Sequence, residues 1–321
     1  MFVICVESSH QKGMGHLFRC LNLLEYLKLI HEPYLVLINN HEPSVNILTE
    51  KRIIFIIVDI TDRESDWESK LIKEYQVDIW LNDRLETNIQ HAINVKKNNI
   101  LLVTFDDRGS GAGLSDLHFA PLHFKKTTQL KGRKVFTGID YLILNTEIEY
   151  YKRLRSGVNN IIVSLGGSDT HGVTLKVVQI LKEIGQGATV HIGPSFEHRE
   201  ELEKLIDENF QVIERVPSLI QLFSRYDLAV TGGGITPFEA NASGLPCFVI
   251  ANEPFEISNG RFLDLNGSSS FVCYHRDLNI SIFTDILKSK RIDIESMSRQ
   301  GLRSIPTNGV ERVYRQIKYD F

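Results

Sequence analysis

A histidine follows two glycines directly after the first apolar run of the chain, in the segment Gly13-Met14-Gly15-His16. Glycines let the backbone turn sharply, and they bring backbone N–H groups close to an anion at the beginning of a helix. His16 would be the first polar side chain of that helix, where an imidazole can act as a general base. The structural alternative is a tight turn in which His16 only caps the helix. A dinucleotide-binding fingerprint is not supported, because Phe18 stands at its third glycine position.

A second candidate site begins with three consecutive glycines, Gly232-Gly233-Gly234, which follow an apolar run. Glycines lose much conformational entropy on folding, so a loop built of them usually lets another group approach the backbone. Thr236 suits the N-cap of the next helix and Pro237 suits its first turn. The free N–H groups at that helix start therefore predict a pyrophosphate site. Glu239 is expected to accept hydrogen bonds from two ribose hydroxyls, or alternatively only to complement the helix dipole.

Two further segments follow apolar runs in the same way. Gly166 and Gly167 are expected to contact phosphate or sugar, or else to form an ordinary turn between strand and helix. Asp106 and Asp107 are expected to face the cleft as candidates for binding the sugar, or else to pair with Arg108. Paired acids can indicate a metal, but no further histidine or carboxylate stands at ligand spacing. We therefore expect neither a metal site nor a cofactor.

Short apolar runs alternate with amphipathic helical stretches along the whole chain, and this alternation must position the motifs. Such a pattern predicts an α/β fold with parallel sheets that are covered on both faces. The pattern restarts near Asn160, so we expect two Rossmann-like domains with parallel sheets that face a cleft. The polar, charged segment Glu147–Gly157 places the boundary, which gives domains 1–150 and 151–321. The last helix, about 309–318, is a candidate to cross back onto the first domain.

The composition excludes several classes of protein. The 321 residues include 36 Lys and Arg against 40 Asp and Glu, a mildly acidic balance that argues against nucleic-acid binding. No apolar run approaches the roughly 20 residues that span a bilayer. The N-terminal residues lack the basic start of a signal peptide, and the four cysteines lie far apart, so we expect a cytoplasmic protein with reduced thiols. The basic stretch from Lys125 to Lys134 predicts a solvated loop, with an anionic acceptor or peripheral membrane contact as the alternative.

Taken together, these segments resemble one known family over nearly the whole chain. It comprises the nucleotide-sugar hydrolase of the pseudaminic-acid pathway and the spore-coat-polysaccharide-type predicted glycosyltransferases, both similar to MurG-like enzymes with the GT-B fold. The resemblance rests on Gly13–His16 with Arg19–Leu21, on Asn82–Thr87, Phe105–Asp107 and Gly138–Leu144, and on Gly166–Asp169, Gly233–Thr236, Glu239 and Gly244–Pro246.

The resemblance implies a nucleoside diphosphate, expected to be UDP, that is held mainly by the second domain. Thr236 would lie by the pyrophosphate, Glu239 by the ribose and His16 near the reacting sugar. The implied reaction cleaves the anomeric C–O bond of a nucleotide sugar, in bacterial surface-glycan or nonulosonic-acid biosynthesis. The partners expected are this substrate and a sugar or glycan acceptor, or water.

Two departures leave the nucleophile open. The pathway hydrolase carries Asp-His-Tyr where this chain has Asn82-Asp83-Arg84, and Asn-Gln where Phe255-Glu256 align. Glu256 and Asn259 are the residues expected to reach the sugar. The leading hypothesis is a glycosyltransferase. The alternatives are a hydrolase that uses water and a catalytically inactive nucleotide-sugar-binding protein.

Overall fold

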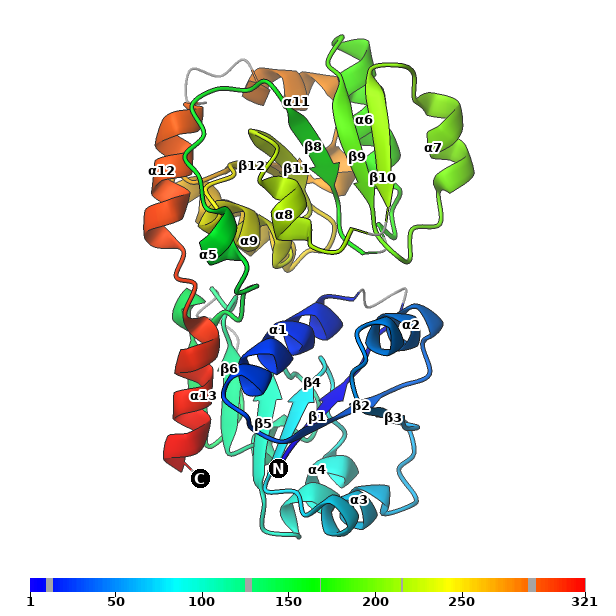
Figure 1. Ribbon diagram of the computed structural model, residues 1–321, viewed down its shortest axis with the longest axis vertical. Helices are drawn as coiled ribbons and strands as arrows, with labels where there is room; N and C mark the ends of the chain where they lie inside the picture. Colours follow the sequence, from blue (N-terminus) through cyan, green and yellow to red (C-terminus); the bar gives the residue numbers. More distant parts are fainter. Residues whose placement is uncertain (10–13, 125–128, 168, 215, 288–292, 321) are drawn as a thin grey trace. The chain divides into compact units, whose positions relative to one another are not determined.

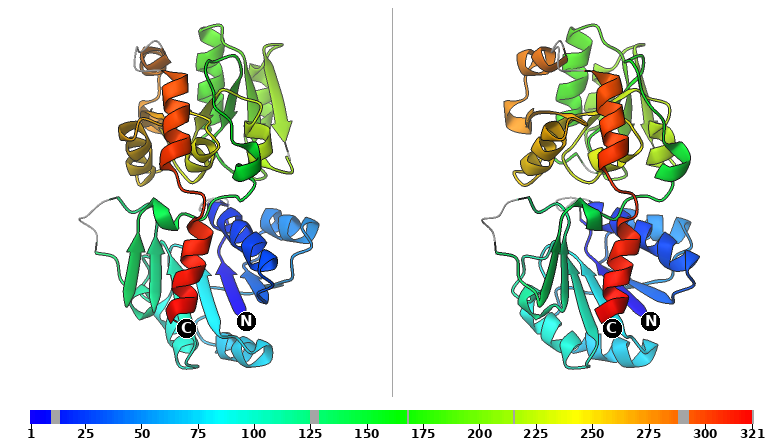
Figure 2. Two further views of the ribbon diagram at one scale, coloured as in Figure 1. Left: turned by 60° about the vertical axis from the view of Figure 1, so that its left-hand side comes forward. Right: turned by 90° about the vertical axis from the view of Figure 1, so that its left-hand side faces the viewer.

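The computed structural model describes residues 1–9, 14–124, 129–167, 169–214, 216–287 and 293–320 (Figures 1 and 2). Gly13, Ser168, Lys125 and Lys126 lie outside these residues. The chain divides into two compact units: unit 1 combines Met1–Ile143 with Asn308–Phe321, and unit 2 is Leu144–Thr307. The division expected from the sequence, between residues 150 and 151, lies seven residues after the one observed between Ile143 and Leu144. The last helix belongs to unit 1.

Unit 1 contains a seven-stranded sheet in the order β3-β2-β1-β4-β5-β6-β7, with every strand pair parallel. The strands are β1 (Phe2–Val6), β2 (Tyr34–Ile38), β3 (Phe55–Ile57), β4 (Ile79–Asp83), β5 (Leu101–Phe105), β6 (Leu117–Ala120) and β7 (Lys134–Thr137). The helices are α1 (Gly15–Leu29), α2 (Glu42–Glu50), α3 (Trp67–Tyr75), α4 (Ile89–Lys96) and α13 (Gly309–Asp320), with short 3₁₀ turns η1 (Ala112–Leu114) and η2 (Ile139–Tyr141).

The central strands of this sheet are buried along their whole length, because helices cover both faces. Phe2 and Ile4 of β1 pack with residues of α1 and α13, whereas Val3, Cys5 and Trp80 pack with residues of α3 and α4. Side chains along a strand alternate between the two faces. The side chains of Asn82 and Asp83, the last two residues of β4, therefore lie on opposite faces of the sheet.

Helix α13 returns to unit 1 and packs against η2 and α1 (Figures 1 and 2). The return needs a glycine, since a Cβ on Gly309 would lie 2.0 Å from the carbonyl oxygen of Leu142. Arg312 Nη1 then pairs with Asp140 Oδ1 at 2.7 Å. The segment Gly138–Leu144, one of those on which the family resemblance rests, therefore anchors the C-terminal helix α13.

Unit 2 contains a six-stranded parallel sheet in the order β10-β9-β8-β11-β12-β13. The strands are β8 (Ile161–Ser164), β9 (Ala188–Ile192), β10 (Phe210–Glu214), β11 (Leu228–Thr231), β12 (Cys247–Ala251) and β13 (Ser270–Tyr274). The helices are α5 (Ile148–Tyr151), α6 (Val173–Glu183), α7 (Arg199–Leu205), α8 (Leu219–Phe223), α9 (Thr236–Ala242), α10 (Glu256–Leu265), α11 (Ile280–Leu287) and α12 (Ile294–Ser304), with a 3₁₀ turn η3 (His275–Asp277). The prediction of two successive parallel sheets is confirmed.

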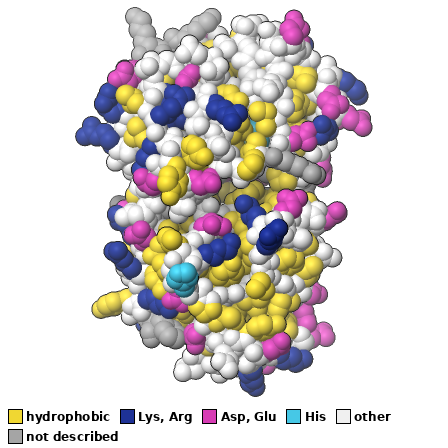
Figure 3. Space-filling model, in the orientation of Figure 1, with side chains coloured by type: hydrophobic (Ala, Val, Ile, Leu, Met, Phe, Trp, Pro, Cys, Tyr) yellow, Lys and Arg dark blue, Asp and Glu magenta, His cyan; other side chains and the backbone are white. Residues whose placement is uncertain are grey.

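The surface carries charges of both signs. On the face shown in Figure 3, Lys and Arg side chains are interspersed with Asp and Glu rather than separated from them. Within the described ranges, no helix has the length and apolar character needed to cross a membrane. The four cysteines are free and buried.

Candidate functional site

His16 and Asp83 meet at the carboxyl end of the unit 1 sheet. His16 is the second residue of α1, and Asp83 is the last residue of β4, whose neighbour in the sheet is β1. His16 Nδ1 lies 2.7 Å from Asp83 Oδ1, and the two side chains are only 12% and 2% exposed. Ligands of doubly wound sheets bind at this edge, so the contact lies where a substrate is expected.

Arg19 joins this pair from the next turn of α1. Its Nε donates to Asp83 Oδ2 at 2.9 Å, and its Nη1 donates to Asp106 Oδ2 at 2.6 Å. Burial by itself would raise the pKa of Asp83, but the Arg19 charge and the hydrogen bonds from Arg19 and His16 outweigh it and hold the pKa at about 2. Asp83 is therefore a carboxylate throughout the physiological range, able to orient a histidine.

The geometry assigns the tautomer of His16. Arg19 Nη2 lies 3.3 Å from Nδ1 and can only donate, whereas the Asp83 carboxylate is closer and can only accept. We therefore place the proton of the neutral ring on Nδ1, where it is donated to Asp83. The other ring nitrogen, Nε2, then keeps its lone pair and can accept a proton.

Asp106 and Asp107, which are adjacent in sequence, have different surroundings. Asp106 has a φ of 51°, the left-handed conformation that Asp tolerates better than most residues, and its carboxylate holds Arg19. Asp107 Oδ1 accepts the backbone N–H groups of Thr87 at 2.9 Å and of Gly109 at 2.8 Å. Asp106 thus joins the His16 network, while Asp107 organises the loops after β4 and β5.

The opposite face of β4 ends in a buried polar cluster. His91 Nδ1 lies 2.8 Å from Glu68 Oε1, and His91 Nε2 lies 3.2 Å from Asn82 Oδ1. Arg84, which stands where the hydrolase resemblance expects a tyrosine, is buried, and its Nε and Nη2 have no hydrogen-bond partner among the described residues. His91 of α4 and Glu68 of α3 thus tie the end of β4 to the helices on this face of the sheet.

In unit 2 the three glycines form a loop between β11 and α9, here called the glycine loop (Gly232–Ile235). Asn259 Nδ2 donates to the Gly233 carbonyl at 2.8 Å, and a Cβ on Gly233 would lie 2.6 Å from Glu256 Cβ. The loop therefore packs directly on α10, and only glycine fits at position 233. Gly234 is more open, since the nearest atom to a Cβ there would be Glu256 Oε1 at 3.6 Å.

The residues after the glycine loop partly match the prediction. Helix α9 begins at Thr236 and its N-cap is Ile235, so the N-cap prediction for Thr236 is wrong by one residue. Pro237 lies in the first turn, as predicted. The carboxylate of Glu239 already accepts the backbone N–H of Asn145 at 3.3 Å through Oε1.

The other glycine pair lies between β8 and α6. Gly166 has a φ of 103°, in the region that favours glycine, and open space surrounds the position of its missing Cβ. The Gly167 carbonyl accepts the N–H of Ser195 at 2.9 Å. Asp169 accepts the N–H groups of Val173 at 2.9 Å and Thr174 at 2.7 Å, and so caps α6 itself. Gly166 is thus the more accessible member of the pair.

The predicted residues therefore form two groups. Gly15, His16, Asp106 and Asp107 belong to unit 1, and the glycine loop, Thr236, Glu239, Glu256, Asn259, Gly166 and Gly167 belong to unit 2. Sequence reasoning missed the roles of Asp83 and Arg19. Arg19 is three residues from His16 and so lies on the same face of α1. Asp83 ends β4, and it reaches Arg19 and His16 only because β4 is the neighbour of β1 in the sheet. In the described part of the chain, no three His, Cys, Asp or Glu residues are grouped to hold a metal.

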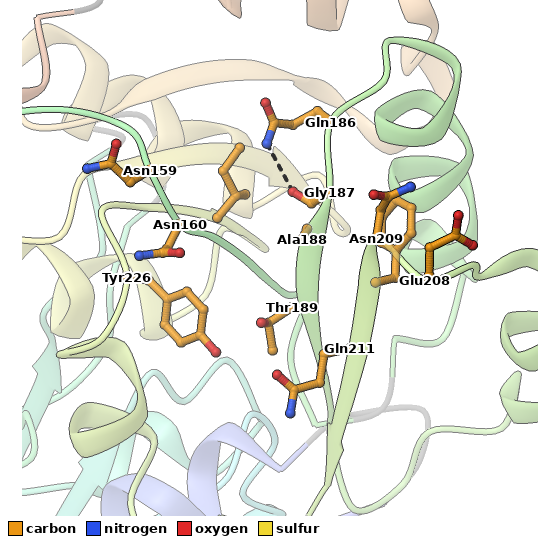
Figure 4. Close-up of a pocket in the computed structure, with 12 residues that line it drawn as sticks. Asn159, Asn160, Gln186, Gly187, Ala188, Thr189, Glu208, Asn209, Gln211 and Tyr226 are labelled. Carbon is orange, nitrogen blue, oxygen red and sulfur yellow. Dashed lines mark hydrogen bonds between the residues drawn. The ribbon is translucent and has the colours of Figure 1, made fainter.

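A separate polar cavity of about 360 Å³ lies at the other end of the unit 2 sheet (Figure 4). Its lining comes from the residues that precede or begin β8, β9 and β10, together with Tyr226. The glycine loop and Gly166 follow the opposite strand ends, so none of the predicted site residues lines this cavity.

Comparison with known proteins shows which folds and sequences this chain is similar to. No family model matches the sequence. The spore coat polysaccharide biosynthesis protein SpsG of Bacillus subtilis is 25% identical over 262 residues, which cover 77% of this chain and 76% of SpsG. Acinetobacter baumannii MurG has a TM-score of 0.68 at 14% identity over 99% of both chains. The S. aureus MnaA–UDP structure has a TM-score of 0.63 at 14% identity, over 99% of this chain and 96% of MnaA. The chain is a distant homologue of SpsG with a GT-B fold.

Proposed function

We propose that this protein cleaves the anomeric C–O bond of a nucleotide sugar, with a UDP-sugar as the favoured donor, and transfers the glycosyl group to an acceptor hydroxyl. The observation that carries the proposal is the His16–Asp83 contact at the carboxyl end of the unit 1 sheet. A protein that only bound nucleotides would not need a histidine held ready to accept a proton. The GT-B fold and the distant homology to SpsG support the donor class and a place in polysaccharide biosynthesis.

His16 acts as the base in the proposed reaction. Its Nε2 takes the proton of the acceptor hydroxyl while the oxygen attacks the anomeric carbon, and the electron pair of the breaking C–O bond leaves with the nucleoside diphosphate. The imidazolium that forms is stabilised by the Asp83 carboxylate 2.7 Å from Nδ1. Arg19 and Asp106 hold that carboxylate in place.

Unit 2 binds the donor in the same proposal. The N–H groups of the glycine loop and of Thr236 receive the diphosphate, with Gly166 and Gly167 beside it. The carboxylate of Glu239 receives the ribose hydroxyls. Glu256 and Asn259, which lie against the glycine loop, are the side chains proposed to be nearest to the sugar. Backbone N–H groups bind phosphate oxygens well because each donates a directed hydrogen bond without added charge.

Water is the alternative nucleophile, as in the pseudaminic-acid-pathway hydrolase that the sequence resembles. The His16–Asp83 pair would serve a water molecule equally well, because either nucleophile must lose one proton. One assay separates the hypotheses: the protein is incubated with UDP-sugars, with and without candidate sugar acceptors, and UDP release is measured. Release that requires an acceptor supports transfer, and release without one supports hydrolysis. Tight binding without release would show a protein that only binds, and would contradict the proposal.

A further inference from the structure

Glu256 places a carboxylate against the backbone that the proposed function gives to the donor diphosphate. Glu256 Oε2 accepts three backbone N–H groups: Gly233 at 3.1 Å, Asn252 at 2.7 Å and Glu253 at 3.4 Å. Two of these N–H groups follow β12 and one belongs to the glycine loop after the neighbouring strand β11. Several N–H groups that converge on one oxygen form an anion-binding nest, and here the anion is part of the chain itself.

The second oxygen of this carboxylate is uncommitted. In the described part of the chain Glu256 Oε1 has no hydrogen-bond partner, and it lies 3.6 Å from where a Cβ of Gly234 would be. Glu256 is only partly buried, so this oxygen is open to approach by another group. Asn259 Oδ1, on the next turn of α10, is buried and has no partner among the described residues. A buried acceptor of this kind needs a water or another molecule to complete its hydrogen bonding.

The charge of Glu256 is not balanced by a described cation. None of its contacts is an ion pair, and the charged group that acts on it is Glu253, another acid. The imidazole of His171 is bound to Glu253 instead, through Nε2 at 3.1 Å, and it stacks on His275. Burial, followed by the weaker influence of Glu253, raises the pKa of Glu256, although its three backbone hydrogen bonds act in the opposite direction.

We propose that Glu256 is an internal competitor of the donor diphosphate, so that its negative charge sets the affinity of the glycine loop for nucleotides. This inference rests on the proposed function. A diphosphate that approaches Gly233 and Gly234 meets a carboxylate that already holds one of their N–H groups and repels phosphate charge over a few ångströms. Binding then requires Glu256 to turn away or to take up a proton.

A purely structural role for Glu256 makes the opposite prediction. If the carboxylate only clamps the glycine loop to α10, then weakening its hydrogen bonds would disorder the loop and reduce nucleotide affinity. Glutamine in place of Glu256 keeps the size and one acceptor oxygen but removes the charge. The sign of the change in affinity therefore distinguishes competition from clamping.

The test measures binding of UDP, TDP, GDP and ADP to the full chain by calorimetry at pH 7.5, for the wild type and Glu256→Gln. We expect Glu256→Gln to bind the preferred nucleotide about tenfold more tightly, because it removes the like charge beside the diphosphate. The matched control is Glu203→Gln, which removes the same charge from exposed helix α7; it should change affinity by less than about twofold.

The outcomes distinguish failure of the competition by Glu256 from failure of the proposed function. Tighter binding by Glu256→Gln alone supports the competition. Unchanged or weaker binding by a folded Glu256→Gln variant overturns it and leaves the proposed function intact. If neither the wild type nor the variant binds any of the four nucleotides, the proposed function fails and the competition falls with it. Glu256→Ala provides a second check, since competition predicts a gain in affinity and clamping predicts a loss.

Discussion

His16 Nδ1 and Asp83 Oδ1 lie 2.7 Å apart although the two residues are 67 positions apart in the sequence. The contact exists because β4, which ends at Asp83, pairs directly with β1, which leads to His16. His16 thus follows β1 in the chain, and Asp83 ends β4, the parallel strand beside it. The proposed base and the carboxylate proposed to orient it therefore stand on a helix and a strand rather than on a loop, which is the arrangement that precise proton transfer needs.

Asp83→Asn should lower kcat for nucleotide-sugar cleavage by about 10²- to 10⁴-fold, because an amide can donate to Nδ1 and favour the wrong tautomer. The affinity for UDP should be unchanged, since the nucleotide is assigned to unit 2. Asp106→Asn is the matched control: it also removes a carboxylate from Arg19 but does not touch His16. Equal losses of kcat in both variants would show that Asp83 acts only by holding Arg19.

Glu239→Ala should weaken UDP binding by about 1–3 kcal/mol, the loss expected when charge-assisted hydrogen bonds to the ribose are removed. The fold should survive, because a first-turn acid contributes under about 1 kcal/mol to a helix. Calorimetry with UDP and a thermal melt on the same preparation test both statements. A variant that binds UDP like the wild type would remove the ribose assignment and leave Glu239 as a partner of the Asn145 N–H.

The stability of unit 1 should fall as the pH drops from about 6.5 to 4. Burial, with help from the charge of Arg84, lowers the pKa of His91 to about 4, against the opposing hydrogen bond from Glu68. An unfolded histidine titrates near 6.5, so the unfolded chain binds more protons in this window and is favoured as the pH falls. The free energy of unfolding should lose up to about 3 kcal/mol from this group.

Tryptophan fluorescence measures this effect selectively, because both tryptophans of the chain, Trp67 and Trp80, lie in unit 1 and beside His91. Urea unfolding is compared at pH 7 and pH 4.5 for the wild type, His91→Gln and, as a control, exposed His31→Asn. The pH-dependent loss should shrink in His91→Gln and persist in His31→Asn. The same loss in all three proteins would assign the effect to other groups.

Much of the fold could be predicted from the sequence, because fully buried parallel strands appear as continuous apolar runs. Phe2–Val6 and Leu101–Phe105 are apolar runs of this kind, and both are strands over their full length. Strand β7 was missed, because Lys134–Thr137 is an edge strand with largely exposed residues and no apolar run. Ile53–Val58 is also an apolar run and predicts a strand of six residues, but β3 at the other edge of the sheet spans only Phe55–Ile57.

The site was predicted less completely than the fold, and for a physical reason. Glycine runs and a histidine at a helix start are visible locally, so the sequence alone makes His16 and the glycine loop candidates. The partners of these groups depend on which strands are neighbours and on how helices pack, which periodicity does not encode. The sequence therefore does not reveal the contact of Asp83 with His16 or the hydrogen bond from the Gly233 N–H to Glu256, while a contact of Glu256 with the sugar stays a prediction.

The proposed role of His16 as the base is tested by measuring release of nucleoside diphosphate by His16→Gln, together with its UDP affinity and melting temperature. The variant should be folded, bind UDP within about twofold of the wild type and turn over about 10²- to 10⁴-fold more slowly, because the proposed proton acceptor is lost while the proposed donor site in unit 2 is unchanged. A lowered melting temperature with near-normal turnover would show instead that His16 is only a structural residue of α1.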